Sequence, residues 1–303
     1  MASGLGRTLT PTQLFIRGQG ESLMDATLSQ LLESIDLIPT GDLQSLSGGD
    51  IAAVYRLDTR QGQVVIKHDD AARLRGEAEG LRTLRSACEQ LVVPEVLGLS
   101  AGWLVIESLN TVPGGPQSSA ALGEGLRGLH GVIGDAHGWH QDNACGRTPQ
   151  SNAPLSDGRA FQRERRLLPL CDACYQQGLL DSELRGRIER LAQDLESWLP
   201  NAPPSLLHGD LWSGNVLFTT KGPAIIDPAV YRHYPEVDLA MLTLFGSPGE
   251  AFFDAYWNGD APTDWPRREA LFQLYPLLNH LLLFGGGYSS AVERSVMRLA
   301  TYA

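Results

Sequence analysis

Residues 208–215, with the sequence HGDLWSGN, constrain the fold of this chain more than any other segment. They place Asp210 and Asn215 five residues apart, and Asp227 follows twelve residues later at the end of a short apolar run. Between them, the apolar residues 216–218 and a Lys-Gly pair at 221–222 predict a hairpin. Such a hairpin would return Asp227 to the loop, so that one amide and two carboxylates meet at one place.

These side chains have the spacing of a kinase catalytic loop. The pattern H-R-D-L-x-x-x-N matches at His208, Asp210, Leu211 and Asn215. In that pattern the aspartate meets the attacking hydroxyl group, while the asparagine and a second aspartate bind Mg²⁺ beside the phosphates of ATP. Because Mg²⁺ prefers oxygen ligands, we expect Asn215 and Asp227 to hold the metal. We expect Asp210 to orient the acceptor hydroxyl and to take its proton.

An upstream strand and helix supply the residues expected at the ATP phosphates. The run VVIK at 64–67 resembles the strand whose lysine neutralises the α- and β-phosphates, which predicts that role for Lys67. A glutamate on the next helix should hold this lysine, and Glu77 is favoured over Glu79 because it borders the apolar face of the helix. Alone, each would be read as a solvated surface charge; their order relative to 208–215 favours function.

Two further segments complete the expected nucleotide site. Gly48 and Gly49 lie in the turn SGGD that precedes the first strand, and they are the predicted phosphate-covering loop, although the full glycine pattern of kinases is missing. Glu107 and Leu109 mark the predicted hinge between the lobes, whose backbone would pair with adenine.

The order of expected elements predicts an α+β protein of the bilobal, protein-kinase-like kind. An N-terminal lobe with an antiparallel sheet and a helix would precede a mainly helical lobe, and a Pro/Gly-rich linker at 112–116 separates the two patterns. The expected elements are a helix over 24–35, strands over 51–57 and 63–67, a helix over 71–84, a strand over 103–107 and a helical run over 181–199.

The domain boundaries follow from this pattern. Residues 1–23 are polar and without period, and are interpreted as an extension for which disorder is one interpretation. Residues 24–108 form the expected lobe for the ATP phosphates, and residues 109–303 form the expected catalytic and acceptor-binding lobe.

Composition excludes some partners. With 24 Lys+Arg against 35 Asp+Glu, the net charge of -11 argues against nucleic acid and anionic membranes. No apolar run of about 20 residues and no signal sequence is present, and the four cysteines do not form a disulfide framework, so a cytoplasmic location is expected. Cys171 and Cys174 form a lone C-x-x-C for which core packing is favoured over zinc. Both monomer and homodimer remain open.

Departures from the protein-kinase pattern indicate a small-molecule acceptor. Gly209 replaces the usual arginine, Pro228 follows Asp227 in place of Phe-Gly, and no Ala-Pro-Glu closes an activation segment. Aminoglycoside and choline kinases share this reduced pattern and stay as an alternative. A nucleotide-binding pseudokinase is the alternative without enzymatic activity, and the intact Lys67, Asp210 and metal-binding pair argue against it.

Beyond the loop, the chain resembles the fructosamine/ketosamine-3-kinase family over roughly residues 24–299. The tryptophan inside the loop and the terminal NHL and FGGGY motifs are the most specific elements. The motifs that carry the resemblance are SGGDI at 47–51, GW at 138–139, DN at 142–143, TPQ at 148–150, ERRL at 164–167, HGDLWSGN at 208–215, DPA at 227–229, EVDLAM at 236–241, NHL at 279–281 and FGGGY at 284–288.

The resemblance implies ATP-dependent phosphorylation of the sugar O3 of a ketosamine, the rearranged adduct of a reducing sugar and an amine, either free or attached to a protein. The phosphorylated product is unstable and can shed the amine, which is the logic of deglycation repair. Bacterial members are thought to favour ribulosamines and erythrulosamines. The stretch 153–159 lacks the aromatic residues that many members carry there, so acceptor preference would differ if it borders the acceptor site.

Four more residues receive roles. Two interpretations of Trp212 stay open, stacking on the acceptor sugar and core packing. For His280, which lies among leucines, a hydrogen-bonded core histidine is favoured and a substrate contact is the second interpretation. His208 and Asp238 are interpreted as structural supports of the catalytic loop. Structural roles are also favoured over a metal cluster for the histidines at 130, 137 and 140.

Overall fold

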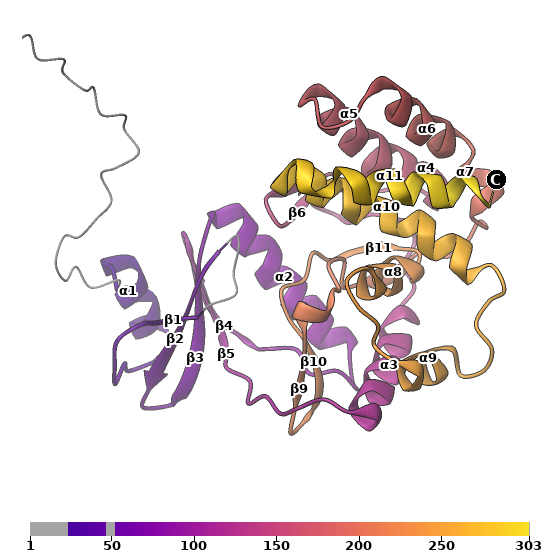
Figure 1. Ribbon diagram of the computed structural model, residues 1–303. Coiled ribbons are helices and arrows are strands. Elements are labelled where there is room, and N and C mark those ends of the chain that lie inside the picture. The colour runs from indigo at the N-terminus through magenta and orange to yellow at the C-terminus, as the bar shows by residue number, and fades with distance from the viewer. Residues whose placement is uncertain (1–23, 47–51, 303) are drawn as a thin grey trace, which may run out of the picture.

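The computed structural model describes residues 24–46 and 52–302 (Figure 1). The extension over 1–23 and the expected covering-loop residues Gly48 and Gly49 lie outside the described residues. Within the described part, a β-rich lobe and a helical lobe stand side by side, joined by the segment between β5 and α3. The predicted α+β, bilobal class is confirmed.

The N-terminal lobe is built on an antiparallel five-stranded sheet with the strand order β1-β2-β3-β5-β4. Two helices accompany it, α1 and α2. The elements are α1 (Ala26–Ser34), β1 (Gln44–Ser45), β2 (Ala53–Thr59), β3 (Gly62–His68), α2 (Ala71–Ala87), β4 (Val96–Ser100) and β5 (Trp103–Glu107).

The alternation of side chains along β3 positions the predicted ATP lysine. Successive residues of a strand point to opposite faces. Val64 and Ile66 pack against α1 in one apolar cluster, whereas Val65 joins the cluster that contains α2. Lys67 is in phase with Val65, so it points from the sheet toward α2 and away from α1.

The C-terminal lobe consists of helices with three small antiparallel ribbons, β6–β7, β8–β11 and β9–β10. Its helices are α3 (Pro116–His130), α4 (Gly158–Phe161), a π-helix η1 (Gln162–Leu167), α5 (Leu168–Gln176), α6 (Ser182–Gln193), α7 (Leu195–Trp198), α8 (Glu236–Leu244), α9 (Glu250–Trp257), α10 (Trp265–Phe284) and α11 (Ser289–Ala300), with short 3₁₀ turns η2 (Ser213–Asn215) and η3 (Gly286–Tyr288). The ribbon strands are β6 (Asn143–Cys145), β7 (Thr148–Gln150), β8 (Ser205–Leu207), β9 (Val216–Thr219), β10 (Gly222–Ile225) and β11 (Tyr231–His233).

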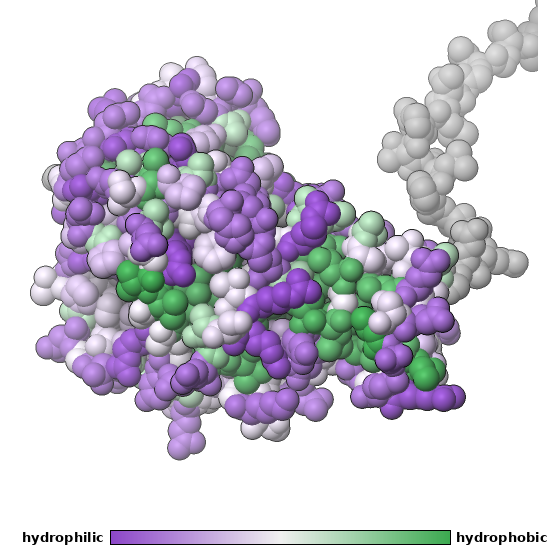
Figure 2. All heavy atoms as spheres, turned by 180° about the vertical axis from the view of Figure 1, so that it is seen from behind, coloured by the Kyte–Doolittle hydropathy of each residue, from purple (hydrophilic) through white to green (hydrophobic). Residues whose placement is uncertain are grey.

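Two large apolar cores, beside a small cluster of Phe161, Leu207 and Tyr231, hold the C-terminal lobe. One surrounds α10 and includes Cys171 and Cys174, both buried, which confirms that this pair serves packing. The other runs from Leu74 and Leu81 of α2 through Leu126 of α3 into the ribbons, so α2 belongs to a core that both lobes share. On the face shown in Figure 2, apolar residues gather in separate patches on both lobes and polar residues cover most of the rest.

Most expected elements are present, with some corrections. The predicted hairpin pairs Val216 with Ile225 and turns at Thr220 and Lys221. The expected helical run over 181–199 is wrong as one helix, because α6 ends at Gln193 and α7 begins at Leu195. None of the helices in the described part of the chain combines the length and apolar character that crossing a bilayer requires.

Gly123 of α3 provides a test of helix packing. A Cβ atom there would lie 2.3 Å from the carbonyl oxygen of Phe252 on α9, whereas one at Gly128 of the same helix would meet nothing closer than 3.7 Å. We expect Gly123→Ala to lower the free energy of unfolding by about 1–3 kcal/mol through overpacking. Gly128→Ala should raise it by up to about 1 kcal/mol through helix propensity. Urea unfolding measures the free energy of unfolding of both variants. A change of the same sign in Gly123→Ala and Gly128→Ala would contradict the packing argument.

Candidate active site

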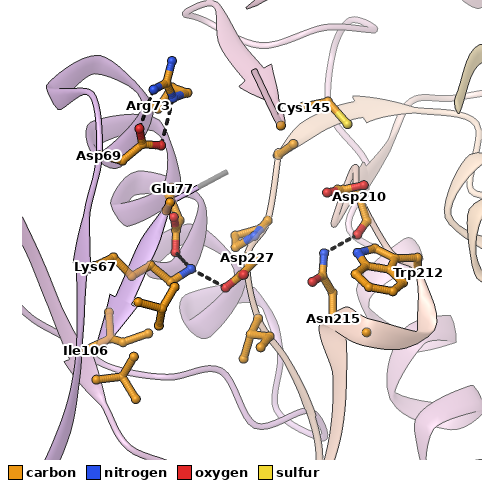
Figure 3. Close-up of a pocket in the computed structure, with 18 of the residues that line it drawn as sticks. Lys67, Asp69, Arg73, Glu77, Ile106, Cys145, Asp210, Trp212, Asn215 and Asp227 are labelled. Carbon is orange, nitrogen blue, oxygen red and sulfur yellow. Dashed lines mark hydrogen bonds and ion pairs between the residues drawn. The ribbon is translucent and has the colours of Figure 1, made fainter. Parts of the chain in front are cut away.

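A cleft of about 1340 Å³ lies between the two lobes and is lined by both. Lys67 and Glu77 reach it from β3 and α2, whereas Asp210, Trp212 and Asn215 reach it from the opposite wall (Figure 3). Residues far apart in the sequence therefore meet in one cavity.

Lys67 is the centre of an ion-pair triad. Its Nζ atom lies 2.6 Å from Oε1 of Glu77 and 2.5 Å from Oδ1 of Asp227, and the residue is 4 % exposed. Burial alone would lower the pKa of Lys67, but the two carboxylates raise it above its ordinary value. The ammonium group is therefore charged. The predicted contact with Glu77, rather than with Glu79, is present.

Glu79 makes a different contact, which the sequence did not indicate. Its carboxylate accepts hydrogen bonds from Trp139 Nε1 at 3.0 Å and from Gln141 Nε2, and lies 2.8 Å from His140 Nε2. These three residues belong to the loop before β6 in the C-terminal lobe. Glu79 thus connects α2 directly to the opposite lobe, two residues from Glu77.

Asn215 and Asp227 both line the cleft and carry the oxygen atoms that could hold a metal ion. Asn215 Nδ2 donates to the carbonyl oxygen of Asp210 at 2.8 Å, which leaves Asn215 Oδ1 as the free amide atom. Asp227 has a φ of 58°, a left-handed conformation that is uncommon for a residue with a side chain. Among the described residues, no group of three His, Cys, Asp or Glu could hold a metal. Two oxygen ligands completed by substrate phosphates are a usual arrangement for Mg²⁺.

Asp210 has an unexpected neighbour in Cys145 of β6. The pKa of Asp210 is raised to about 7, mainly because the carboxyl group is buried. The hydrogen bond from the Cys145 thiol acts against this increase. The backbone carbonyl and the Sγ atom of Cys145 each lie 3.4 Å from Nδ2 of Asn279 on α10. A lone cysteine 65 residues upstream of the aspartate gives no sequence signal for this contact.

The loop that carries Asp210 is fixed by Asp238 on α8. The carboxylate of Asp238 is fully buried and accepts the backbone N–H groups of His208 at 2.7 Å and Gly209 at 2.9 Å. His130 Nε2 lies 3.2 Å from the same carboxylate. Gly209 has a φ of +84°, and a Cβ there would meet the Ala229 carbonyl oxygen at 2.0 Å, so this position requires glycine.

On the C-terminal side of the cleft, the core-packing interpretation of Trp212 is wrong, and that of His280 holds only in part. Trp212 is 39 % exposed and lines the cleft, so it does not pack in the core. A side chain at Gly214 would overlap the Trp212 ring, which therefore lies against the bare backbone there. His280 is hydrogen-bonded, as favoured above, with Nδ1 2.7 Å from the Pro276 carbonyl oxygen, but it is half-buried and lines the cleft instead of lying in the core.

The other histidines and the stretch 153–159 have structural surroundings. His130 and His137 are buried and hydrogen-bonded, the first to Tyr256 at 2.7 Å and the second to His233 at 3.0 Å, as expected for structural residues. None of residues 153–159 lines the cleft. The stretch therefore does not border the cleft, and its lack of aromatic residues gives no reason to expect a different acceptor preference.

Glu107 and Leu109, the two ends of the predicted hinge, have different surroundings. The backbone N–H of Glu107 donates to the Glu95 carbonyl at 2.9 Å, and its side chain lies 3.3 Å from Lys221. The Glu107 amide is thus engaged within the protein. Leu109, two residues later, lines the cleft.

The lobes, the lysine triad and the loop define a protein-kinase-like phosphotransferase fold, and comparison with solved structures agrees. An aminoglycoside phosphotransferase, APH(2″)-IIa, solved with streptomycin and ATP, superposes with a TM-score of 0.60 at 18% identity over 89% of this chain and 94% of that one. A protein of Thermobifida fusca YX-ER1, provisionally assigned as a fructosamine-3-kinase, gives a TM-score of 0.85 at 28% identity over 94% and 100%.

The sequence comparisons give the family. The family model described as fructosamine kinase matches residues 24–301. A protein of Lactiplantibacillus plantarum named "Probable ketoamine kinase" is 35% identical over 279 residues, which cover 88% of this chain and 97% of the relative. The chain belongs to the fructosamine kinase family, as its motifs indicated.

Substitution of Asp238 tests the support of the loop. In Asp238→Asn one oxygen is replaced by an NH₂ group that faces a backbone donor, so we expect a loss of about 2–4 kcal/mol in the free energy of unfolding. Burial would raise the pKa of Asp238, but the hydrogen bond to His130 helps to lower it overall. A depressed pKa contributes stability above the unfolded value of about 4 that is lost as pH falls.

The difference between Asp238→Asn and the wild type should therefore shrink below pH 4, as urea unfolding across pH can measure. Asp254→Asn, at an exposed position of α9, is the matched control and should stay within about 0.5 kcal/mol of the wild type. A variant at 238 that is as stable as the control would contradict the supporting role.

Proposed function

We propose that this chain is an ATP- and Mg²⁺-dependent kinase that phosphorylates the sugar O3 of ketosamines. The observation that carries the proposal is the meeting of Asp210, Asn215 and Asp227 with the Lys67–Glu77 pair in one cleft. Membership of the fructosamine kinase family supports the sugar-amine acceptor. Residues 24–108 would serve the nucleotide, and residues 109–303 catalysis and the acceptor.

We assign the phosphates, the adenine and the metal ion of the nucleotide to separate groups of the protein. Lys67, held by Glu77, would neutralise the α- and β-phosphates, with Gly48 and Gly49 covering them. The Glu107 amide is engaged by Glu95, so we assign adenine recognition to the Glu107 carbonyl and the Leu109 amide. The free Oδ1 of Asn215 and the carboxylate of Asp227 are the proposed metal ligands.

Transfer of the phosphoryl group follows from this arrangement. Asp210 would orient the O3 hydroxyl and accept its proton as the oxygen forms a bond to the γ-phosphorus and the bond to the β-phosphate oxygen breaks, which releases ADP. Mg²⁺ supplies neutralisation of the phosphate charge. Asp238 and His208 would hold Asp210 in place, and Trp212 would stack on the sugar. Catalysis of this kind rests mainly on positioning and electrostatics.

The proposed acceptor would give the activity a repair role. An O3-phosphorylated ketosamine can eliminate its amine, which would free a glycated amino acid or protein. The same ATP-site residues would also serve an aminoglycoside- or choline-type kinase, so the acceptor has to be tested directly.

A panel of acceptors tests the function. ATP consumption with Mg²⁺ is measured against ribulose-lysine, fructose-lysine, kanamycin and choline, and the product masses are determined. Phosphorylation of a ketosamine followed by release of lysine is the expected result. Turnover only on kanamycin or choline would overturn the ketosamine assignment, and ATP binding without any turnover would favour the pseudokinase alternative.

Asp210→Asn tests the catalytic assignment. The amide cannot accept the hydroxyl proton, so we expect phosphoryl transfer to fall by at least about 100-fold, while ATP affinity changes little. Single-turnover rates and equilibrium ATP binding measure the two effects separately. Asp254→Asn serves as the control, and wild-type turnover in Asp210→Asn would show that another group acts as the base.

Glu79→Gln tests whether the contact between α2 and the opposite lobe supports the lysine triad. The substitution weakens three contacts two residues from Glu77, so we expect the KM for ATP to rise about three- to tenfold, equivalent to about 0.7–1.4 kcal/mol. Glu89→Gln, at an exposed position just beyond α2, is the matched control. An unchanged KM for ATP in Glu79→Gln would mean that α2 is held without this contact.

A further inference from the structure

The C-terminal side of the cleft carries a cluster of aromatic rings, which we call the aromatic wall: Phe245, His280, Phe284 and Tyr288. The His280 ring lies 5.0 Å from that of Phe245, 5.6 Å from Phe284 and 5.1 Å from Tyr288, measured between centroids. All four residues line the cleft, and Phe245 and Phe284 are 46 % and 50 % exposed. Large apolar rings held at the mouth of a cleft indicate a ligand-binding surface.

The tautomer of His280 follows from its one hydrogen bond. Its Nδ1 atom lies 2.7 Å from the carbonyl oxygen of Pro276, which can only accept, so Nδ1 carries the proton. Burial lowers the pKa of His280, which favours the neutral ring. Nε2 is then a hydrogen-bond acceptor, and it has no protein partner within residues 24–46 and 52–302.

Asn279, at the base of the wall, presents a second acceptor. The carbonyl of Cys145 lies 3.4 Å from one amide atom of Asn279, which must be the donor Nδ2 because a carbonyl only accepts. The remaining atom, Oδ1, is buried and has no hydrogen-bond partner in the described part of the chain. Asn279 is 2 % exposed and lines the cleft. Since Cys145 also bonds Asp210, this acceptor lies close to the proposed base.

The basic residues of the cleft all come from one lobe, whereas carboxylates line it from both. The Lys and Arg residues that line it, Arg56, Lys67 and Arg73, all come from the N-terminal lobe. The aromatic wall contains no Lys or Arg residue, and it presents ring faces and hydrogen-bond acceptors to the cleft. Its one hydroxyl group, that of Tyr288, can also donate. Ring faces attract cations, and two unpaired acceptors match a group that only donates.

Resting on the proposed action on ketosamines, we propose that the aromatic wall, with Asn279 at its base, binds the protonated amine of the acceptor. The secondary ammonium of a ketosamine has two N–H donors, a positive charge and no acceptor. A parent sugar lacks that charge. The wall would therefore select ketosamines over free ketoses, while Asp210 and Trp212 act on the sugar half.

A matched pair of acceptors tests this selection: N-propyl ribulosamine, and 1-O-propyl ribulose, in which an ether oxygen replaces the ammonium at nearly the same shape. We expect the wild type to favour the amine by about tenfold or more in kcat/KM. Phe284→Leu and His280→Phe should each reduce this ratio severalfold and leave the KM for ATP unchanged. Tyr175→Leu, at an exposed aromatic residue of α5, should keep the wild-type ratio.

The outcomes separate this proposal from the proposed function. Equal turnover of amine and ether by the wild type would overturn the ammonium site and leave the kinase assignment intact. A ratio unchanged in both wall variants would also overturn it, because a merely structural role slows both acceptors in parallel. Absence of phosphorylation of either acceptor would overturn the ketosamine kinase function and this site with it. Equal turnover by the wild type would decide against the site even if a variant fails to fold.

Discussion

The site depends on one buried charge, the ammonium group of Lys67. A buried ion is tolerated only when its charge is compensated, and here Glu77 and Asp227 compensate it from α2 and from the segment after β10. The triad therefore fixes a strand of one lobe, a helix and the Asp227 carboxylate of the other lobe relative to one another. Removal of either carboxylate would leave a charge that burial penalises.

Close packing makes this arrangement possible. Gly80 of α2 faces Pro228, where a Cβ would lie 3.0 Å from the proline ring, so the helix can approach the segment that carries Asp227. Glu79 holds the same helix to Trp139 and its neighbours in the C-terminal lobe. In protein kinases an activation segment controls this helix. Here the contacts of Glu77, Glu79 and Gly80 hold the helix within the fold, which is consistent with a chain that lacks the Ala-Pro-Glu of an activation segment.

The sequence predicted those parts of the site whose placement follows from local pattern. The phase of β3 directs Lys67, the register of β9 and β10 returns Asp227 to the loop, and the apolar face of α2 selects Glu77. What could not be predicted depends on tertiary contact. Cys145 reaches Asp210 only through the packing of β6. The buried Arg166 lies in a π-helix, where the Tyr231 ring, 4.1 Å away, is among its contacts, and no period in the sequence indicates either.

His280 shows why the C-terminal side of the cleft was the hardest part to predict. A histidine among leucines is usually a core residue, and its neighbours on α10 are indeed buried. The face of α10 that carries His280 nevertheless lines the cleft. There the His280 ring contacts the rings of Phe245, which directly follows α8, and of Tyr288 in η3, and neither ring buries it completely. Exposure of that face is a property of how α8, α10 and η3 pack. The cleft consequently joins a side that carries its basic residues, with Lys67 paired to carboxylates, to a side built of aromatic rings and unpaired hydrogen-bond acceptors.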